Sequence, residues 1–68
     1  MELRKRFGTN VRKHRLAAGF TQESFADHAG LHRNYVSDIE RGRRNPTLEV
    51  VEKVSLALGV DASVLMIP

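Results

Sequence analysis

The 68-residue sequence contains no cysteine and no long apolar run. Without cysteine the chain can form neither a disulfide framework nor a thiolate metal site, which agrees with a reducing compartment. Its uninterrupted apolar runs span a few residues, far fewer than the ~20 that cross a bilayer. The first residues, MELRKRFG, lack the apolar block of a signal peptide. We therefore expect a cytoplasmic protein with no membrane partner.

Motifs of catalysis and of metal binding are also missing. The sequence contains no phosphate-binding loop, zinc motif or nucleophile–base arrangement. His28 and His32 are four residues apart, but Gly30 separates them, so they do not share one helical face. We therefore expect no enzyme activity, no metal and no cofactor.

Positive charge is concentrated in the first two thirds of the chain. Residues 1–46 carry ten Lys and Arg against five Asp and Glu, whereas residues 47–68 carry one against three. This asymmetry suggests a face that contacts a polyanion, although by charge alone a solvated basic surface is the better interpretation. A chain this short also buries a small core, so a partner subunit would add stability.

Glycines and capping residues divide the chain into helices. Four glycines follow stretches with helical periodicity, and glycine ends helices by adopting the left-handed conformation: Gly19, Gly30, Gly42 and Gly59. Three N-cap residues stand where helices should begin: Thr21, Thr47 and Asp61. These marks predict one all-α domain over residues 1–68, a compact bundle of five helices at 2–18, 21–28, 32–41, 47–58 and 61–66.

The helical period also predicts the core. The inward positions of the first helix are Leu3, Phe7, Val11 and Ala18. Those of the fourth helix are Leu48, Val51, Val54, Ser55 and Leu58, and Leu65 closes the core beneath them. No alternation of strand period competes with this interpretation.

The second and third helices form a sharp corner. The link at residues 29–31 is too short for a relaxed antiparallel hairpin, so the two helices must cross steeply. Ala26, Gly30 and Val36 provide the small and β-branched residues that a close crossing needs. This is the pattern of a helix-turn-helix, whose second helix can enter the major groove of DNA.

The third helix has a polar outer face. Because Val36 and Ile39 must face inward, the helical period turns the polar side chains outward or to the flanks. These side chains are Arg33, Asn34, Tyr35, Ser37, Asp38 and Arg41. Arginine pairs with guanine, asparagine with adenine, and serine with either partner. The stretch therefore predicts a helix that reads base edges.

Glu40 falls on the inward side of the same helix. An unpaired buried carboxylate is expensive, so Glu40 should have a partner. Arg15 flanks the apolar stripe of the first helix and is the candidate. Two exposed charges that contribute little are the alternative. Removing one member of a buried pair should cost about 3–5 kcal/mol.

Residues 11–60 resemble the Cro/C1-type (XRE) helix-turn-helix family. The resemblance rests on R…AGFTQ…A, YVSDIERGRRNPT and LALGV, and it covers nearly the whole chain. It implies a five-helix, lambda-repressor-like DNA-binding domain, usually a dimer on a palindromic operator, that regulates transcription. The RNY run in this short chain is similar to the controller proteins of restriction-modification systems, although phage-type repressors share most of it.

The resemblance implies roles for single residues. Gln22 would grip phosphate and brace the third helix, and Arg15 with Glu40 matches the family's structural ion pair. The positions that touch bases or backbone are Arg33, Asn34, Tyr35 and Ser37. The loop positions that approach the next phosphates are Arg43, Arg44 and Asn45.

Two residues depart from the family pattern. His32 stands at an N-cap where Ser or Thr is more usual, so either the cap is weak or the imidazole contacts a phosphate. Asp38 is an acid on the DNA-facing side. It could accept from cytosine N4 or be held by Arg41 one turn on, and the second interpretation is favoured.

The end of the chain has more apolar residues than its core needs. The surplus residues are Leu56, Val64 and Ile67. Contiguous exposed apolar residues usually form an interface, although scattered surface aliphatics are common. A DNA-binding dimer must place two recognition helices roughly 34 Å apart. We therefore expect a homodimer formed through the helix at 61–66.

Too little chain follows residue 60 for a ligand-sensing domain, so we expect no small-molecule effector. The expected partners are an operator in double-stranded DNA and a second copy of the chain, with RNA polymerase as a further candidate. Whether the protein represses or activates depends on where the operator lies. An antitoxin-like or protein-interaction module is the alternative function.

Overall fold

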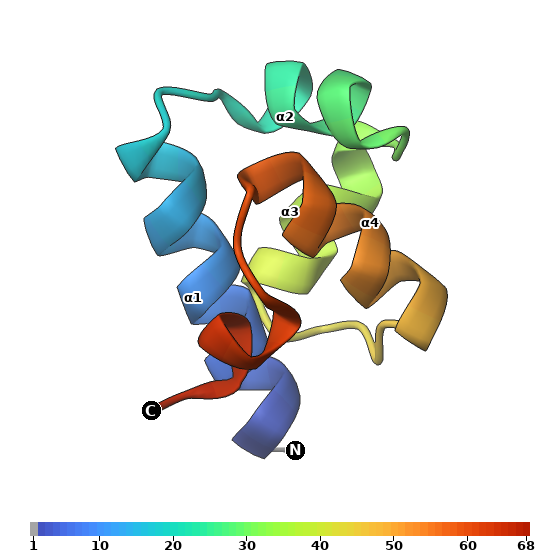
Figure 1. Cartoon of the computed structure of the whole chain (residues 1–68). Helices are drawn as coiled ribbons and strands as arrows, with labels where there is room; N and C mark the ends of the chain where they lie inside the picture. Colours follow the sequence, from blue (N-terminus) through green and yellow to red (C-terminus); the bar gives the residue numbers. More distant parts are fainter. Residues whose placement is uncertain (1) are drawn as a thin grey trace.

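The computed structural model describes residues 2–68, which form four α-helices and one 3-10 helix (Figure 1). The α-helices are α1 (Glu2–Ala17), α2 (Gln22–Ala29), α3 (Arg33–Glu40) and α4 (Leu48–Leu58). The 3-10 helix is η1 (Ala62–Met66). No residue between 2 and 68 lies in a strand. Within that range no helix has the length and apolar character needed to span a bilayer.

The all-α prediction is confirmed, but the prediction of a fifth α-helix is wrong. Asp61 does cap the last segment, because its side chain accepts a hydrogen bond of 3.0 Å from the backbone N–H of Ser63. The segment that follows is only five residues long, and Ile67 after it is extended, as residues before proline tend to be. So short a segment favours the tighter i→i+3 pattern.

The predicted helix boundaries at the other caps hold to within one or two residues. Thr21 and Ser24 form a capping box at the start of α2. Thr47 accepts a hydrogen bond of 3.1 Å from the N–H of Val50 at the start of α4. Gly30 has a φ of 73°, so the left-handed residue that ends α2 also makes the corner before α3.

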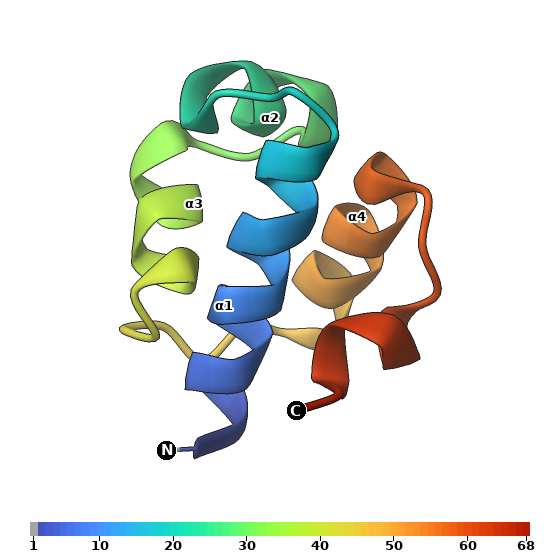
Figure 2. The ribbon, with the colours of Figure 1, turned by 90° about the vertical axis from the view of Figure 1, so that its left-hand side faces the viewer.

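Helix α1 runs between the other elements. In Figure 2 it faces the viewer, with α3 on one side, α4 and η1 on the other, and α2 across the top. Both α3 and η1 pack against α1. The buried apolar side chains form one core: Phe7, Val11, Phe25, Ala26, Val36, Ile39, Val51, Val54 and Leu65.

Three residues predicted for the core are exposed instead. Ala18 lies beyond the last residue of α1 and no longer follows its period. Leu3 lies in the first turn of α1 and Leu48 is the first residue of α4, where 88% of it is exposed. Periodicity identifies the inward face of a helix, but it does not tell how far along the axis the core extends.

Gly8 on α1 has a role that no pattern in the sequence indicates. A Cβ atom added there would collide with the carbonyl oxygen of Ile39 and lie 3.1 Å from the backbone of Glu40. Helix α1 therefore meets the end of α3 backbone to backbone. Because a glycine in a helix interior is otherwise unfavourable, this close approach explains its presence.

Candidate nucleic-acid interface

The outer side of α3 is polar and accessible, as the helical period predicts. Val36 and Ile39 are buried and face the core. Of the side chains expected outward or on the flanks, the exposed ones are Arg33, Asn34 and Arg41, and the N-cap residue His32 is exposed as well. The partly buried ones are Tyr35, Ser37 and Asp38. Helix α3 lies at the edge of the molecule, with α1 on its inner side (Figure 2).

The corner before α3 is closed by backbone contacts. The N–H of Leu31 donates to the carbonyl oxygen of Ala26 over 2.8 Å, across the left-handed Gly30. Ala26 and Val36 are both buried, one on each helix of the corner. The two helices are thus held at a fixed crossing by small and β-branched side chains, as the sequence predicts.

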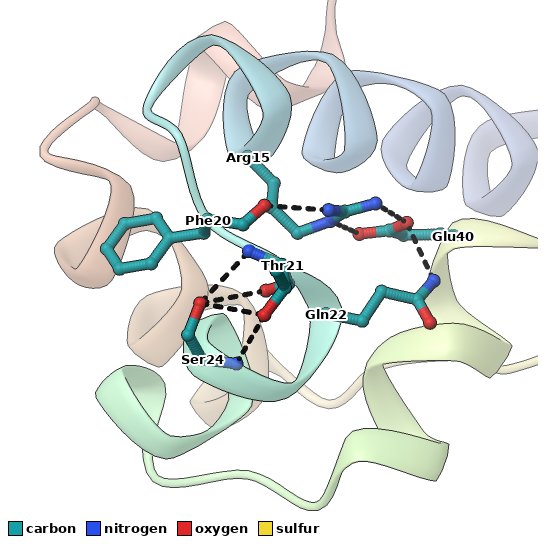
Figure 3. A network of polar contacts seen from close by, with 6 residues as sticks. All are labelled: Arg15, Phe20, Thr21, Gln22, Ser24 and Glu40. Carbon is teal, nitrogen blue, oxygen red and sulfur yellow. Dashed lines mark hydrogen bonds and ion pairs between the residues drawn. The ribbon is translucent and has the colours of Figure 1, made fainter.

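A buried ion pair joins α1 to the end of α3 (Figure 3). The Nε of Arg15 donates to Oε2 of Glu40 over 2.7 Å, and its Nη2 donates to Oε1 over 3.0 Å. The side chains of Arg15 and Glu40 are 7% and 3% exposed. The predicted pair is therefore present, and it has the bidentate geometry in which guanidinium–carboxylate pairs are strongest.

Two further groups complete this network (Figure 3). The Nη1 of Arg15 donates to the carbonyl oxygen of Phe20 over 2.9 Å, and Nε2 of Gln22 donates to Oε1 of Glu40 over 3.1 Å. Phe20 lies in the link before α2 and Gln22 is the first residue of α2. The network thus fixes α1, α2 and α3 to one another, and a buried charge with this many partners is compensated.

Asp38 is held by a residue of the loop that follows α3. The Nε of Arg44 lies 3.4 Å from Oδ2 of Asp38, and the Arg44 guanidinium carbon lies 4.5 Å from the centre of the Tyr35 ring. The prediction that Arg41 holds Asp38 is therefore wrong. The N–H of Arg43 donates to the carbonyl oxygen of Asp38, so the loop folds back over α3 and brings Arg44 to the acid.

The start of α3 differs from the starts of the other short helices. His32 is its N-cap residue, but its side chain accepts no hydrogen bond from the helix. The cap is therefore weak, which was one of the two interpretations of this departure. The first backbone N–H groups of α3 remain without a side-chain acceptor.

The loop between α3 and α4 adds further exposed cationic and amide groups. Its exposed residues include the three for which the resemblance implies contact with phosphate: Arg43, Arg44 and Asn45. Together α3 and the loop carry six exposed arginines and amides: Arg33, Asn34, Arg41, Arg43, Arg44 and Asn45. We call the polar residues among 32–45 the polar surface.

The residues predicted for a dimer interface lie on α4 (Leu56), in η1 (Val64) and directly after η1 (Ile67). Leu56 is 74% exposed and Ile67 is 55% exposed, while Val64 is partly buried. Leu48 adds a second exposed leucine, and it lines one open depression together with Leu56 and Ala62. We call Leu56, Val64 and Ile67 the apolar edge.

Comparison with known proteins gives a consistent result. The profile of the helix-turn-helix family HTH_3 matches residues 11–65. The control protein C.BamHI of Bacillus amyloliquefaciens is 48% identical over 65 residues, which are 94% of this chain and 80% of that protein.

Two solved structures have the same fold. The hypothetical transcription factor NHTF from Neisseria superposes with a TM-score of 0.92 at 44% identity, over 97% of this chain and 76% of that one. The restriction-modification controller protein C.AhdI from Aeromonas hydrophila superposes with a TM-score of 0.90 at 37% identity, over 96% of this chain and 98% of that one.

Proposed function

This chain belongs to the helix-turn-helix family of XRE-type transcriptional regulators, and from that premise we propose that it binds a specific sequence of double-stranded DNA through α3. The observation that carries the proposal is the exposure of Arg33 and Asn34 on a helix whose opposite side is locked in the core. In the major groove these side chains would pair with guanine and adenine, and Ser37 with either.

Rigid support of α3 favours base reading. Side chains discriminate bases only when the helix that carries them keeps its register, and the network of Arg15, Glu40 and Gln22 connects α3 to two other helices. One N–H of the Gln22 amide is used on Glu40, and the second is available to a phosphate oxygen. Gln22 can thus support α3 and contact the DNA backbone at the same time.

Phosphate contacts would come from the rest of the polar surface. Arg43 and Asn45 are exposed beside α3, and His32 lies at its uncapped start. Arg41 would extend these contacts from the other end of the helix. Arg44 is bound to Asp38 and stacked on Tyr35. It would therefore orient the Tyr35 ring while its own guanidinium faces the DNA backbone.

We further propose that two copies pair through the apolar edge and bind a palindromic operator, because a twofold dimer would present two identical copies of α3 to the duplex. The exposed Leu56 and Ile67 would be covered in such a dimer. A dimer bound near a promoter would act through its position relative to RNA polymerase, either by exclusion or by contact.

The DNA-binding proposal is tested by selecting bound duplexes from a random pool and measuring affinity at several salt concentrations. We expect a common sequence and a log-log salt slope that steepens by about 0.9 for each phosphate neutralised. Arg33→Ala should relax the base preference, whereas Arg43→Ala should weaken all duplexes alike. Lys53→Ala, which removes one charge from the exposed side of α4, serves as the control.

An isotherm without preference among duplexes would contradict this function and leave a protein-interaction module as the better interpretation. The dimer is tested separately by sedimentation of Val64→Glu and Ile67→Glu. Both should give folded monomers with poor operator affinity. Leu16→Glu, which places the same charge on an exposed leucine of α1, should leave the dimer intact. Unchanged sedimentation of the first two variants would remove this edge as the interface.

A further inference from the structure

Asn10 connects α1 to the C-terminal segment. Its Nδ2 donates two hydrogen bonds, one of 2.9 Å to the carbonyl oxygen of Leu65 and one of 2.8 Å to the carbonyl oxygen of Ile67. Both acceptors belong to residues that lie more than fifty positions away in the sequence. A single side-chain amide therefore uses both of its N–H groups to hold the backbone on either side of Met66.

Besides these two bonds, the segment is held by apolar contacts, because Leu65 is buried in the core and Ala62 and Met66 pack against it. Helix η1 is only five residues long and ends at the extended Ile67, so its last carbonyl groups have no partner within a helix. Leu65 is fully buried and anchors the segment in the core. Apolar contacts fix the depth of a short segment but are not directional, whereas two hydrogen bonds to the carbonyl oxygens on either side of Met66 fix the direction of its backbone.

The two hydrogen bonds thus act on the two residues of the apolar edge that belong to this segment, Val64 and Ile67, whereas Leu56 lies on α4. Val64 precedes the buried Leu65, and Ile67 is itself a residue whose carbonyl Asn10 holds. If the segment turned about Leu65, both side chains would change direction relative to α1. The Asn10 amide fixes the directions of the Val64 and Ile67 side chains relative to α1.

The same stretch of α1 also sets the position of α3. Gly8 contacts the backbone of Ile39 and Glu40, and it lies two residues before Asn10. At about 100° per residue the two positions point to different sides of the helix. Within one turn, α1 therefore meets α3 on one side and η1 on the other, as the arrangement in Figure 2 shows.

From this arrangement we propose that Asn10 is a positioning residue, which fixes the apolar edge relative to α3 and thereby sets the separation of the two half-sites that the dimer recognises. This inference rests on the proposed function, because it needs a dimer on DNA. Asn10 itself contacts no DNA in this scheme, since it lies on the side of α1 that faces η1.

The decisive variant is Asn10→Asp. The carboxylate has the same shape as the amide but cannot donate, and it places negative charge against two carbonyl oxygens. Thr9→Asp is the matched control, since it adds the same charge at the neighbouring, exposed position of α1. Asn10→Ala removes the two bonds without adding charge and keeps the test valid if the aspartate variant folds poorly.

The first measurement is amide hydrogen exchange within η1. The N–H of Val64, which donates to Asp61, is a suitable probe. Loss of two neutral hydrogen bonds should speed its exchange on the order of tenfold in both Asn10 variants. Thr9→Asp should exchange like the parent. Parent-like protection of Val64 in both Asn10 variants would overturn the proposal.

The second measurement is the preference for half-site spacing. Half-sites obtained by selection are joined with the spacer shortened or lengthened by one base pair, and affinities are compared. The parent and Thr9→Asp should prefer one spacer, whereas the Asn10 variants should lose on the order of tenfold of this preference. A loss of overall affinity alone would show only a structural role, so an unchanged spacing preference would overturn the proposal.

The two measurements also separate this inference from the function on which it rests. If the parent protein binds no duplex selectively, the proposed function fails, and with it the role of Asn10 in spacing. The exchange of Val64 would then still decide whether Asn10 holds η1 in place.

Discussion

The two sides of α1 are held by different kinds of contact. Toward α3 the contact is a buried ion pair between Arg15 and Glu40 and a backbone approach at Gly8. Toward η1 it is the buried leucine Leu65 and the neutral amide of Asn10. The first kind fails abruptly when one partner is lost, because an uncompensated charge remains buried. The second kind loses stability in smaller steps.

This difference suits two different tasks. Under the proposed function α3 reads bases and must keep its side chains in register, so it gains from contacts that allow one geometry only. In the proposed dimer the contacts of Asn10 need only fix the direction of Val64 and Ile67, because apolar side chains pack against a partner without forming directional bonds. The following variants test whether the α3 side is indeed the stiffer and more sensitive one.

Glu40→Ala should have the largest effect. It leaves the guanidinium of Arg15 buried with one acceptor, the carbonyl oxygen of Phe20, and should lower the free energy of unfolding by about 3–5 kcal/mol. Urea unfolding followed by circular dichroism measures this loss. The double variant Arg15→Met with Glu40→Leu should lose clearly less than the two single alanine variants together. A parent-like midpoint for Glu40→Ala would contradict the assignment.

Gly8→Ala should come next, at about 1–3 kcal/mol, because the new methyl group collides with the carbonyl of Ile39. Alanine has the higher helix propensity, so without the collision the substitution would stabilise the protein by about 1 kcal/mol. Thr9→Ala on the exposed side of α1 provides the comparison and should stay within about 0.5 kcal/mol of the parent. A stabilised Gly8→Ala would disprove the close contact of α1 with α3.

Removal of a helix cap allows the α3 side of the molecule to be compared with α4 at an equal loss of stability. Thr21→Ala and Thr47→Ala each remove an N-cap acceptor and should each lower the free energy of unfolding by about 1 kcal/mol. Only Thr21 adjoins Gln22 and the network that supports α3. Thr21→Ala should therefore also weaken duplex binding, measured by fluorescence anisotropy well below the melting temperature, while Thr47→Ala should not. If both variants lost the same affinity for the duplex, the α3 side would not be the more sensitive one.

Asp61 should give the smallest effect, and one that depends on pH. Hydrogen bonds from the backbone and side chain of Ser63 hold the pKa of Asp61 below its ordinary value of 3.8. A lowered pKa in the folded state stabilises the protein above the unfolded pKa, and this contribution disappears as pH falls through the folded value. Asp61→Asn can cap η1 but does not titrate. Its stability relative to the parent should rise only below about pH 4, as melting curves at stepped pH would show.

The sequence was sufficient for the features that depend on local chemistry. Left-handed glycines, N-cap residues and helical periods gave the four α-helices, the corner before α3 and its polar outer side. The partnership of Arg15 with Glu40 also followed, because a carboxylate on an inward face needs a cation at the same level of the core.

Features that depend on distances between helices could not be read in the same way. The contact of Gly8 with Ile39 is set by how closely two helices cross, and sequence periods carry no such distance. The choice of Arg44 over Arg41 as the partner of Asp38 follows from the path of the loop after Gly42. The 3-10 geometry of η1 reflects the few residues left between Asp61 and Ile67.

The weak cap of α3 has one further consequence. Helices α2 and α4 begin after a threonine whose side-chain oxygen accepts a hydrogen bond from their first turn. Helix α3 begins after His32, whose side chain accepts none. An oxygen supplied from outside the protein would provide that acceptor. The turn itself is already formed in the free protein, because the N–H of Val36 donates to the carbonyl oxygen of His32 over 3.1 Å. Under the proposed function, DNA binding would therefore stabilise the start of α3 without having to fold it.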